Sequence, residues 1–173
     1  MARRTRKLPE RLYGSVIGWE GWSFRVVSSA IGVRYLDLGA NGFPEIAERL
    51  SARIVTDDRT NETPLRQLHE YLAGERRGFT VPLDLHGTDF QRAVWDALLQ
   101  IPYGATVSYS DIAHRIGRPR ALRAVGQALA RNPVPIIVPC HRVVGSAGQL
   151  VGFGGGLPLK ERLIALEAGS LDL

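Results

Sequence analysis

The residues from Val81 to Gly87 divide the chain into two parts that differ in residue pattern. Before this segment, runs of β-branched and aromatic residues alternate with amphipathic helical stretches, whereas the residues after it are mostly helical in pattern. A length of 173 residues suits one domain or two small ones. We therefore predict an α+β protein in which an N-terminal α/β support domain spans residues 1–84 and a mostly helical C-terminal domain spans residues 85–173.

The first part is expected to contain a β-hairpin, one further short strand and two amphipathic helices. Strands are predicted at 23–28, 31–38 and 54–56, and helices at 45–53 and from Pro64 to Gly74. Pro44 and Pro64 suit the start of a helix, and Gly74 suits a helix end. Residues 1–84 offer no candidate nucleophile, phosphate-binding loop or cluster of metal ligands, which is why we interpret them as a support domain.

Two pairs of residues in the second part have the spacing of helix capping boxes. Thr88 precedes Gln91 by three residues, and Ser108 precedes Asp111 by three. At this spacing the two side chains of a pair can cap the first turn of a helix reciprocally. The sequence therefore predicts one helix after Thr88 and a second, short helix from Ser108 through Ile116.

A tight turn, Gly117–Pro119, joins the short helix to a third helix predicted at 120–130. Two short helices joined by such a turn form a candidate helix-turn-helix. Leu122, Val125 and Leu129 are expected to face the interior. The opposite face combines long polar side chains with small ones, namely Arg120, Arg123, Gln127 and Arg131 with Ala121, Ala124, Gly126 and Ala128. This face could contact DNA phosphates closely; the alternative is a plain helical hairpin with a solvated arginine face.

The distribution of charge also favours an anionic partner. The chain has a net charge of +5, and no Asp or Glu occurs from Ile112 through Lys160. The basic residues of this acid-free segment are Arg115, Arg118, Arg120, Arg123, Arg131, Arg142 and Lys160. A field of one sign with clustered arginines makes nucleic acid the leading candidate, and a solvated surface is the alternative.

The only cysteine, Cys140, lies between an apolar run and two basic residues. The run Ile136–Val138 is predicted to be a short buried strand, and Pro139 ends it. Only a thiolate attacks, and His141 and Arg142 could lower the pKa of the thiol from its usual value of about 8.5. The alternative is that Cys140 is a small buried hydrophobic residue.

Two features after Cys140 bear on the same site. The glycine-rich loop Gly145–Gly156 can bring backbone amides close to a ligand. Pro158 is expected to open a helix that ends near Gly169, with Glu167 in its last turn. The helix dipole disfavours an anion there, so Glu167 needs a compensating donor. His141 is one candidate donor, and solvent is the other.

Several classes of protein do not fit the sequence. One cysteine cannot form an internal disulfide or a multi-thiolate zinc site, and the four histidines lack the spacing of metal ligands. We therefore predict no metal and a reducing compartment. No apolar run approaches the length of a membrane span, and the basic segment Met1–Lys7, which is expected to be mobile, lacks the apolar part of a signal peptide. These features predict a cytoplasmic protein that does not bind membranes.

Six motifs in order resemble the O6-alkylguanine-DNA alkyltransferase family, also called the methylated-DNA–protein-cysteine methyltransferases. They are Gly87-Thr88-Asp89-Phe90-Gln91, Val107-Ser108-Tyr109, Arg123-Ala124-Val125-Gly126, Asn132-Pro133-Val134-Pro135, Pro139-Cys140-His141-Arg142-Val143 and Gly154-Gly155-Gly156-Leu157. The resemblance is close from about residue 87 to residue 169 and extends loosely back to about residue 65. It implies direct-reversal DNA repair, in which the alkyl group of O6-alkylguanine, and also of O4-alkylthymine, moves irreversibly to Cys140. Each molecule would act once, without a cofactor.

The resemblance also implies roles for matched residues. His141 is the base that deprotonates Cys140 through a water, and Glu167 orients His141. Asn132 holds the cysteine segment, and Tyr109 donates a hydrogen bond to guanine N3. The remaining matched residues bind the base: the carbonyl groups of Cys140 and Val143 recognise its exocyclic amine, the amide of Gly154 faces O6, and Phe153 stands where some members carry tyrosine.

For DNA, the resemblance implies that the target nucleotide is flipped out of the duplex and that Arg123 fills the gap. The helix would lie in the minor groove, with its other DNA-facing residues at Arg120, Ala124, Gly126, Gln127 and Arg131. The implied fold is a ribonuclease-H-like N-terminal domain followed by a winged-helix-like domain, as a monomer without zinc. Two alternatives remain: a non-catalytic damage sensor or helix-turn-helix regulator, whose known relatives lack the cysteine, and a cysteine hydrolase, which would turn over.

Overall fold

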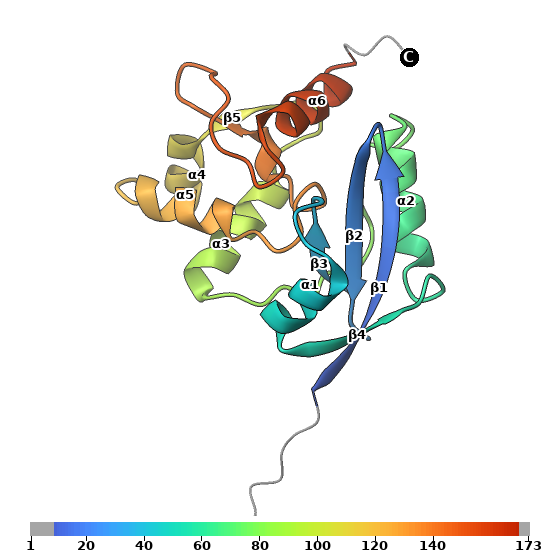
Figure 1. Ribbon diagram of the computed structural model, residues 1–173. Helices are drawn as coiled ribbons and strands as arrows, with labels where there is room; N and C mark the ends of the chain where they lie inside the picture. Colours follow the sequence, from blue (N-terminus) through green and yellow to red (C-terminus); the bar gives the residue numbers. More distant parts are fainter. Residues whose placement is uncertain (1–8, 170–173) are drawn as a thin grey trace, which may run out of the picture.

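The computed structural model describes residues 9–169 and shows a mixed α+β protein with a four-stranded sheet, a two-stranded sheet and six α-helices in that range (Figure 1). The predicted α+β class is therefore confirmed. The basic segment 1–7, predicted to be mobile, lies outside the described residues. Among the helices of residues 9–169, none combines the length and the apolar character that crossing a membrane requires.

The larger sheet is built from the first part of the chain. Its strands are β1 (Glu10–Trp19), β2 (Trp22–Ser28), β3 (Val33–Asp37) and β4 (Ala52–Thr56), in the order β3-β2-β1-β4. The predicted hairpin is confirmed as the antiparallel pair β2–β3. Strand β1 was not predicted. It contains Gly14, where a Cβ atom would lie 2.6 Å from the ring of Phe43, so the close approach of α1 to the sheet requires glycine.

Two helices pack against this sheet. Helix α1 (Phe43–Leu50) ends before the predicted Arg53, because Ser51 adopts a left-handed conformation with φ of 50° and the following residues pair with β1 as strand β4. Helix α2 (Glu62–Leu72) begins two residues before Pro64 and buries Leu68 and Tyr71 completely. Gly74, with φ of 77°, follows its end as predicted.

The second part contains helices α3 (Asp89–Leu99), α4 (Tyr109–Arg115), α5 (Leu122–Ala130) and α6 (Leu157–Glu167). Both predicted capping boxes are formed, at Thr88 and at Ser108. Helix α5 starts two residues later than predicted, because Ala121 donates a turn hydrogen bond to Arg118. Strand β5 (Val107–Ser108) pairs in parallel with β6 (Val143–Val144), which links the start of α4 to the segment after Cys140.

Two predictions for the second part are wrong. The apolar run Ile136–Val138 is buried but is not a strand, since Ile136 has φ of 73° and the amide of Val138 donates to the carbonyl of Val134 at 2.9 Å. On α5, Leu122 is 47% exposed and Ala128 is buried, contrary to the predicted faces. The carbonyl group of Ala128 accepts a hydrogen bond from the Trp95 indole at 2.9 Å, which turns this part of α5 toward α3.

The two parts of the chain share one apolar core. Buried residues of β2, β3 and α2 belong to the same cluster as buried residues of α3, α5 and α6. A buried ion pair also joins β3 to the segment between the two parts, because Arg34 lies 2.7 Å from Asp84. The amide of Leu36 donates to the carbonyl of Pro133 at 2.8 Å. The sheet is thus held firmly against the segment that leads to Cys140.

Candidate active site

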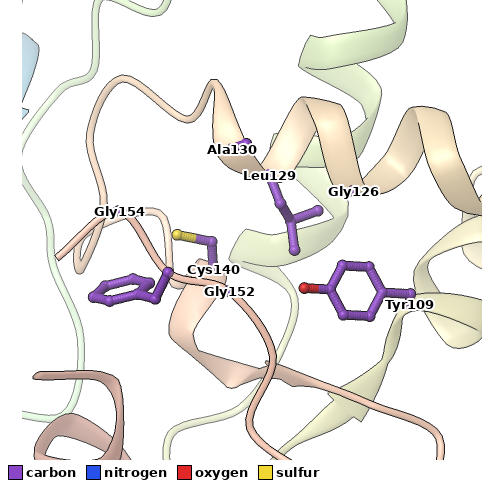
Figure 2. Close-up of a pocket in the computed structure, with 8 residues that line it drawn as sticks. Tyr109, Gly126, Leu129, Ala130, Cys140, Gly152 and Gly154 are labelled. Atoms are coloured by element: carbon purple, nitrogen blue, oxygen red, sulfur yellow. The ribbon is translucent and has the colours of Figure 1, made fainter. Parts of the chain in front are cut away.

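A pocket of about 300 Å³ opens beside the only cysteine of the chain. Three parts of the fold meet there: the start of α4, the end of α5 and the glycine-rich loop. Its lining residues are Tyr109, Gly126, Leu129, Ala130, Cys140, Gly152, Phe153 and Gly154. Figure 2 shows that the Tyr109 hydroxyl points into this pocket from the side opposite Cys140. The structure therefore brings together residues that the sequence places in four separate motifs.

Cys140 begins a short 3-10 helix, η1 (Cys140–Arg142), and is 8% exposed. Burial raises the pKa of its thiol to about 11, although a hydrogen bond with Asn132 and the charge of Lys160 act in the opposite direction. The pKa is therefore not lowered, although the sequence offered His141 and Arg142 as residues that could lower it. Since the thiol is protonated at neutral pH, a base must remove its proton when it reacts.

Asn132 fixes the chain on which Cys140 lies. Its side-chain nitrogen donates to the carbonyl of Val138 at 2.8 Å, and its side-chain oxygen accepts from the amide of Val134 at 3.0 Å. These two bonds bridge the turn that contains the strained Ile136. Asn132 comes directly after Arg131, the C-cap of α5, so it connects the end of this helix to the position of the thiol.

His141 and Glu167 form a buried pair. The Nε2 atom of His141 donates to Oε1 of Glu167 at 2.8 Å, which supplies the donor that a carboxylate in the last turn of α6 needs. Burial lowers the pKa of His141 more than Glu167 raises it, so the imidazole is neutral. Its Nδ1 atom is buried and has no hydrogen-bond partner among the described residues. With Nε2 protonated, Nδ1 carries the free lone pair and can accept a proton.

Glu167 has three further donors that the sequence did not indicate. The Arg142 guanidinium donates to both carboxylate oxygens at 2.9 Å, the Tyr71 hydroxyl donates to Oε1, and the amide of Gly104 donates to Oε2 at 2.9 Å. Burial acts to raise the pKa of Glu167, but hydrogen bonds from His141 and Arg142 outweigh it and lower the pKa to about 2. Glu167 is therefore an anion over the whole physiological pH range.

Lys160 is also part of the site. It is fully buried, and its ammonium group donates to the carbonyl of Val143 at 2.6 Å and to the carbonyl of Val151 at 2.7 Å. These carbonyls lie before and within the glycine-rich loop, so Lys160 holds the loop against the segment that follows Cys140. Lys160 and Arg142 were predicted to belong to a field that attracts nucleic acid. That prediction is wrong for these two residues, because both are buried.

The base-binding residues suggested by the resemblance lie at the pocket or next to it. Phe153 and Gly154 line it, and the Phe153 ring stands edge-on to His141 at 6.5 Å between ring centroids. Val143 is buried, and its carbonyl group is occupied by Lys160. A Cβ atom on Gly154 would meet no atom within 4 Å, so the fold leaves room for a side chain at this position.

Helix α5 connects the pocket to an exposed basic face. Arg120, Arg123 and Arg131 are exposed, and no carboxylate of residues 9–169 lies within 4.0 Å of their guanidinium groups. Arg123 lies on α5, and Arg120 and Arg131 lie just outside its two ends. Ala124 and Gln127 of α5 are also exposed, whereas Gly126 lines the pocket. This surface can meet phosphates without breaking any ion pair. Within the described residues there is no group of three or more His, Cys, Asp or Glu side chains that could hold a metal ion.

The chain is similar to known alkyltransferases over both of its parts. Residues 89–169 match the family model described as 6-O-methylguanine DNA methyltransferase, DNA binding domain. The inducible methylated-DNA–protein-cysteine methyltransferase of Bacillus subtilis is 44% identical over 161 residues, which are 90% of each chain. The corresponding Mycobacterium tuberculosis protein is 47% identical over 152 residues, covering 83% of this chain and 91% of that protein.

Solved structures agree with the sequence comparison. The structure matches the crystal structure of the Mycobacterium tuberculosis O6-methylguanine methyltransferase with a TM-score of 0.82 at 40% identity, over 93% of this chain and 95% of that one. It matches the Mycobacterium tuberculosis OGT in complex with DNA with a TM-score of 0.81 at 40% identity, over 92% and 93% of the two chains. Because the similarity extends over nine-tenths of both chains at 44% identity, the chain belongs to the methylated-DNA–protein-cysteine methyltransferase family.

Proposed function

We propose that this protein repairs DNA directly by transferring the alkyl group of O6-alkylguanine to the sulfur of Cys140, with O4-alkylthymine as a second substrate. The observation that carries the proposal is the position of Cys140 at a pocket beside an exposed basic helix, next to a buried His141–Glu167 pair with a free nitrogen. The pocket volume of about 300 Å³ suits a single flipped base. A free reactive thiol is typical of a reducing compartment, which supports a cytoplasmic location.

The reaction is an in-line displacement at the alkyl carbon. His141 Nδ1 takes the proton of the thiol, through a water, while Glu167 stabilises the imidazolium that forms. The carbon–sulfur bond forms as the carbon–O6 bond breaks, and the electron pair of the broken bond passes to the purine. Burial and the charge of Cys140 raise the pKa of Tyr109. Its hydroxyl therefore stays protonated and can donate to the purine as negative charge develops. The thioether product has no easy route back to a thiol, so each molecule acts once.

DNA is bound through the candidate helix-turn-helix of α4 and α5. In this proposal α5 enters the minor groove, with Arg120, Ala124, Gln127 and Arg131 toward the backbone and Arg123 in the gap left by the flipped nucleotide. Residues 1–84 form a ribonuclease-H-like domain and residues 85–173 a winged-helix-like domain, acting as a monomer. The exposed arginines on α5 and at its ends, which have no carboxylate of residues 9–169 within 4.0 Å, support this assignment.

The function is tested by mixing the protein with duplex DNA that contains one O6-methylguanine. We expect the peptide containing Cys140 to gain the mass of one methylene group, and uptake to stop at one methyl group per protein molecule. Peptide mass spectrometry after digestion measures both. If the protein binds this duplex but the peptide keeps its mass, the protein is a damage sensor or regulator rather than a transferase.

Replacing Arg123 with alanine should slow repair of duplex DNA by roughly 10- to 100-fold, because flipping a base costs on the order of a few kcal/mol. Reaction with free O6-benzylguanine, which needs no flipping, should change by less than about twofold. The rates are compared with those of Arg115→Ala, which removes another exposed arginine, from α4. Equal losses on the two substrates, or equal losses in the two variants, would contradict the role assigned to Arg123.

A further inference from the structure

We propose that Tyr71 is a positioning residue for alkyl transfer, which holds Glu167 and sets how readily His141 accepts the proton of Cys140. This inference rests on the proposed function and deepens it. Tyr71 belongs to α2, which comes from the first part of the chain. The first part of the chain, which we interpreted from the sequence only as a support domain, thus contributes a hydroxyl group to the site.

The contacts of Tyr71 place it inside the His141–Glu167 pair. Its hydroxyl donates to Oε1 of Glu167, the same oxygen that accepts from His141 Nε2 at 2.8 Å. The hydroxyl oxygen also lies 3.3 Å from His141 Nε2. All three side chains are buried, and Tyr71 is completely so. One carboxylate oxygen is therefore shared by a phenol, the imidazole and the Arg142 guanidinium, which donates to it at 2.9 Å.

The packing around Tyr71 fixes the position of its hydroxyl. The Tyr71 ring lies 5.0 Å from the ring of Phe79 and 5.9 Å, edge-on, from the ring of Tyr103. Burial, together with the charge of Glu167, raises the pKa of Tyr71 far above its usual value. The phenol consequently stays protonated and acts toward Glu167 only as a donor. A fixed donor of this kind holds Oε1 in line with His141.

The charges around His141 determine whether Tyr71 raises or lowers the pKa of the imidazole. Glu167 on α6 favours the imidazolium, whereas Arg142 on η1 and Lys160 on α6 disfavour it. The neighbouring Cys140 thiol is protonated, and Tyr103 faces Glu167 as a neutral phenol. The hydroxyl of Tyr71 draws charge away from Oε1 and so weakens the support that Glu167 gives to the imidazolium. Tyr71 thereby keeps His141 neutral and able to accept a proton at lower pH.

The test is the pH dependence of the reaction with free O6-benzylguanine, which requires no DNA. Tyr71→Phe removes the hydroxyl and keeps the packed ring. We expect the rate to fall off on the acid side at a pH about half a unit to one unit higher than in the unaltered protein, because protonated His141 cannot act as a base. Tyr103→Phe is the matched control. Its ring belongs to the same aromatic cluster, but the one hydrogen bond of its hydroxyl within residues 9–169 is to the carbonyl of Leu166, at 3.5 Å. The fall of the rate on the acid side should therefore stay at the same pH in this variant.

The proposal would be overturned if the rate of Tyr71→Phe fell off on the acid side at an unchanged or lower pH. It would also be overturned if Tyr103→Phe shifted that pH by the same amount. A fluorinated tyrosine at position 71 provides a second measurement that does not depend on how well Tyr71→Phe folds. A fluorinated phenol is a stronger hydrogen-bond donor, so the rate should fall off on the acid side at a lower pH. No shift, or a shift to higher pH, would also overturn the proposal. If the proposed function itself fails, the unaltered protein will take up no alkyl group at any pH.

Discussion

Replacing Cys140 with serine should abolish alkyl transfer and leave binding of alkylated duplex DNA within about twofold of the unaltered protein. The chain has no other cysteine, and a serine hydroxyl is a far weaker nucleophile than a thiol at the same position. We expect the rate to fall by at least about 1000-fold, to below detection. Peptide mass spectrometry measures the transfer, and fluorescence anisotropy with a labelled duplex measures the binding.

The geometry explains why binding should survive this change. Asn132 holds the cysteine segment through backbone groups of Val134 and Val138. The basic face of α5 is exposed and does not depend on the sulfur atom. A methyl group that appeared on any other residue of the Cys140→Ser protein would contradict the assignment of Cys140 as the acceptor. A large loss of DNA binding would show that the thiol also maintains the pocket.

Local signals predicted the parts of the fold that local interactions determine. The capping boxes at Thr88 and Ser108 place helix starts correctly, because each depends on two residues three positions apart. The position of Glu167 in the last turn of a helix likewise indicated that its carboxylate needs a donor, because the helix dipole disfavours an anion there. His141 provides this donor. The strand β1 was missed because Gly14 and Gly18 weaken its pattern, and Gly14 is explained only by the close approach of Phe43, which is distant in sequence.

The rest of the site depends on contacts between distant residues. Tyr71 reaches Glu167 across 96 positions of sequence, and Arg142 reaches it across 25. Lys160 appeared to be one surface cation among several, yet it is buried against two carbonyl groups. No pattern within one helix or loop distinguishes such a buried cation from an exposed one. The pKa of Cys140 could not be predicted for the same reason: burial raises it, and the two basic residues that follow it in the sequence do not reverse this effect.

Replacing Glu167 with alanine should lower both stability and reactivity. The variant leaves the buried guanidinium of Arg142 without its carboxylate, and breaking such a pair costs about 3–5 kcal/mol of unfolding free energy. It also removes the acceptor of His141 Nε2, so we expect alkyl transfer to O6-benzylguanine to slow by roughly 100-fold. Urea denaturation gives the first quantity, and single-turnover kinetics give the second. Glu20→Ala is the matched control, because it breaks an exposed ion pair with Arg162 on the same helix and should cost less than about 1 kcal/mol.

A double variant separates the two effects of Glu167. Glu167→Ala combined with Arg142→Met removes the unpaired charge and fills the space of the guanidinium with an apolar side chain. We expect this variant to regain part of the lost unfolding free energy, since apolar groups can replace a buried ion pair at little cost. The rest stays lost, because the donors of Tyr71, His141 and Gly104 remain without their acceptor. It should not regain the rate, because His141 still lacks the carboxylate that stabilises its imidazolium. Recovery of both would show that Glu167 serves only to neutralise Arg142, and recovery of neither would show that Arg142 has a separate role in holding the carbonyl of Ile101, to which it donates at 2.6 Å.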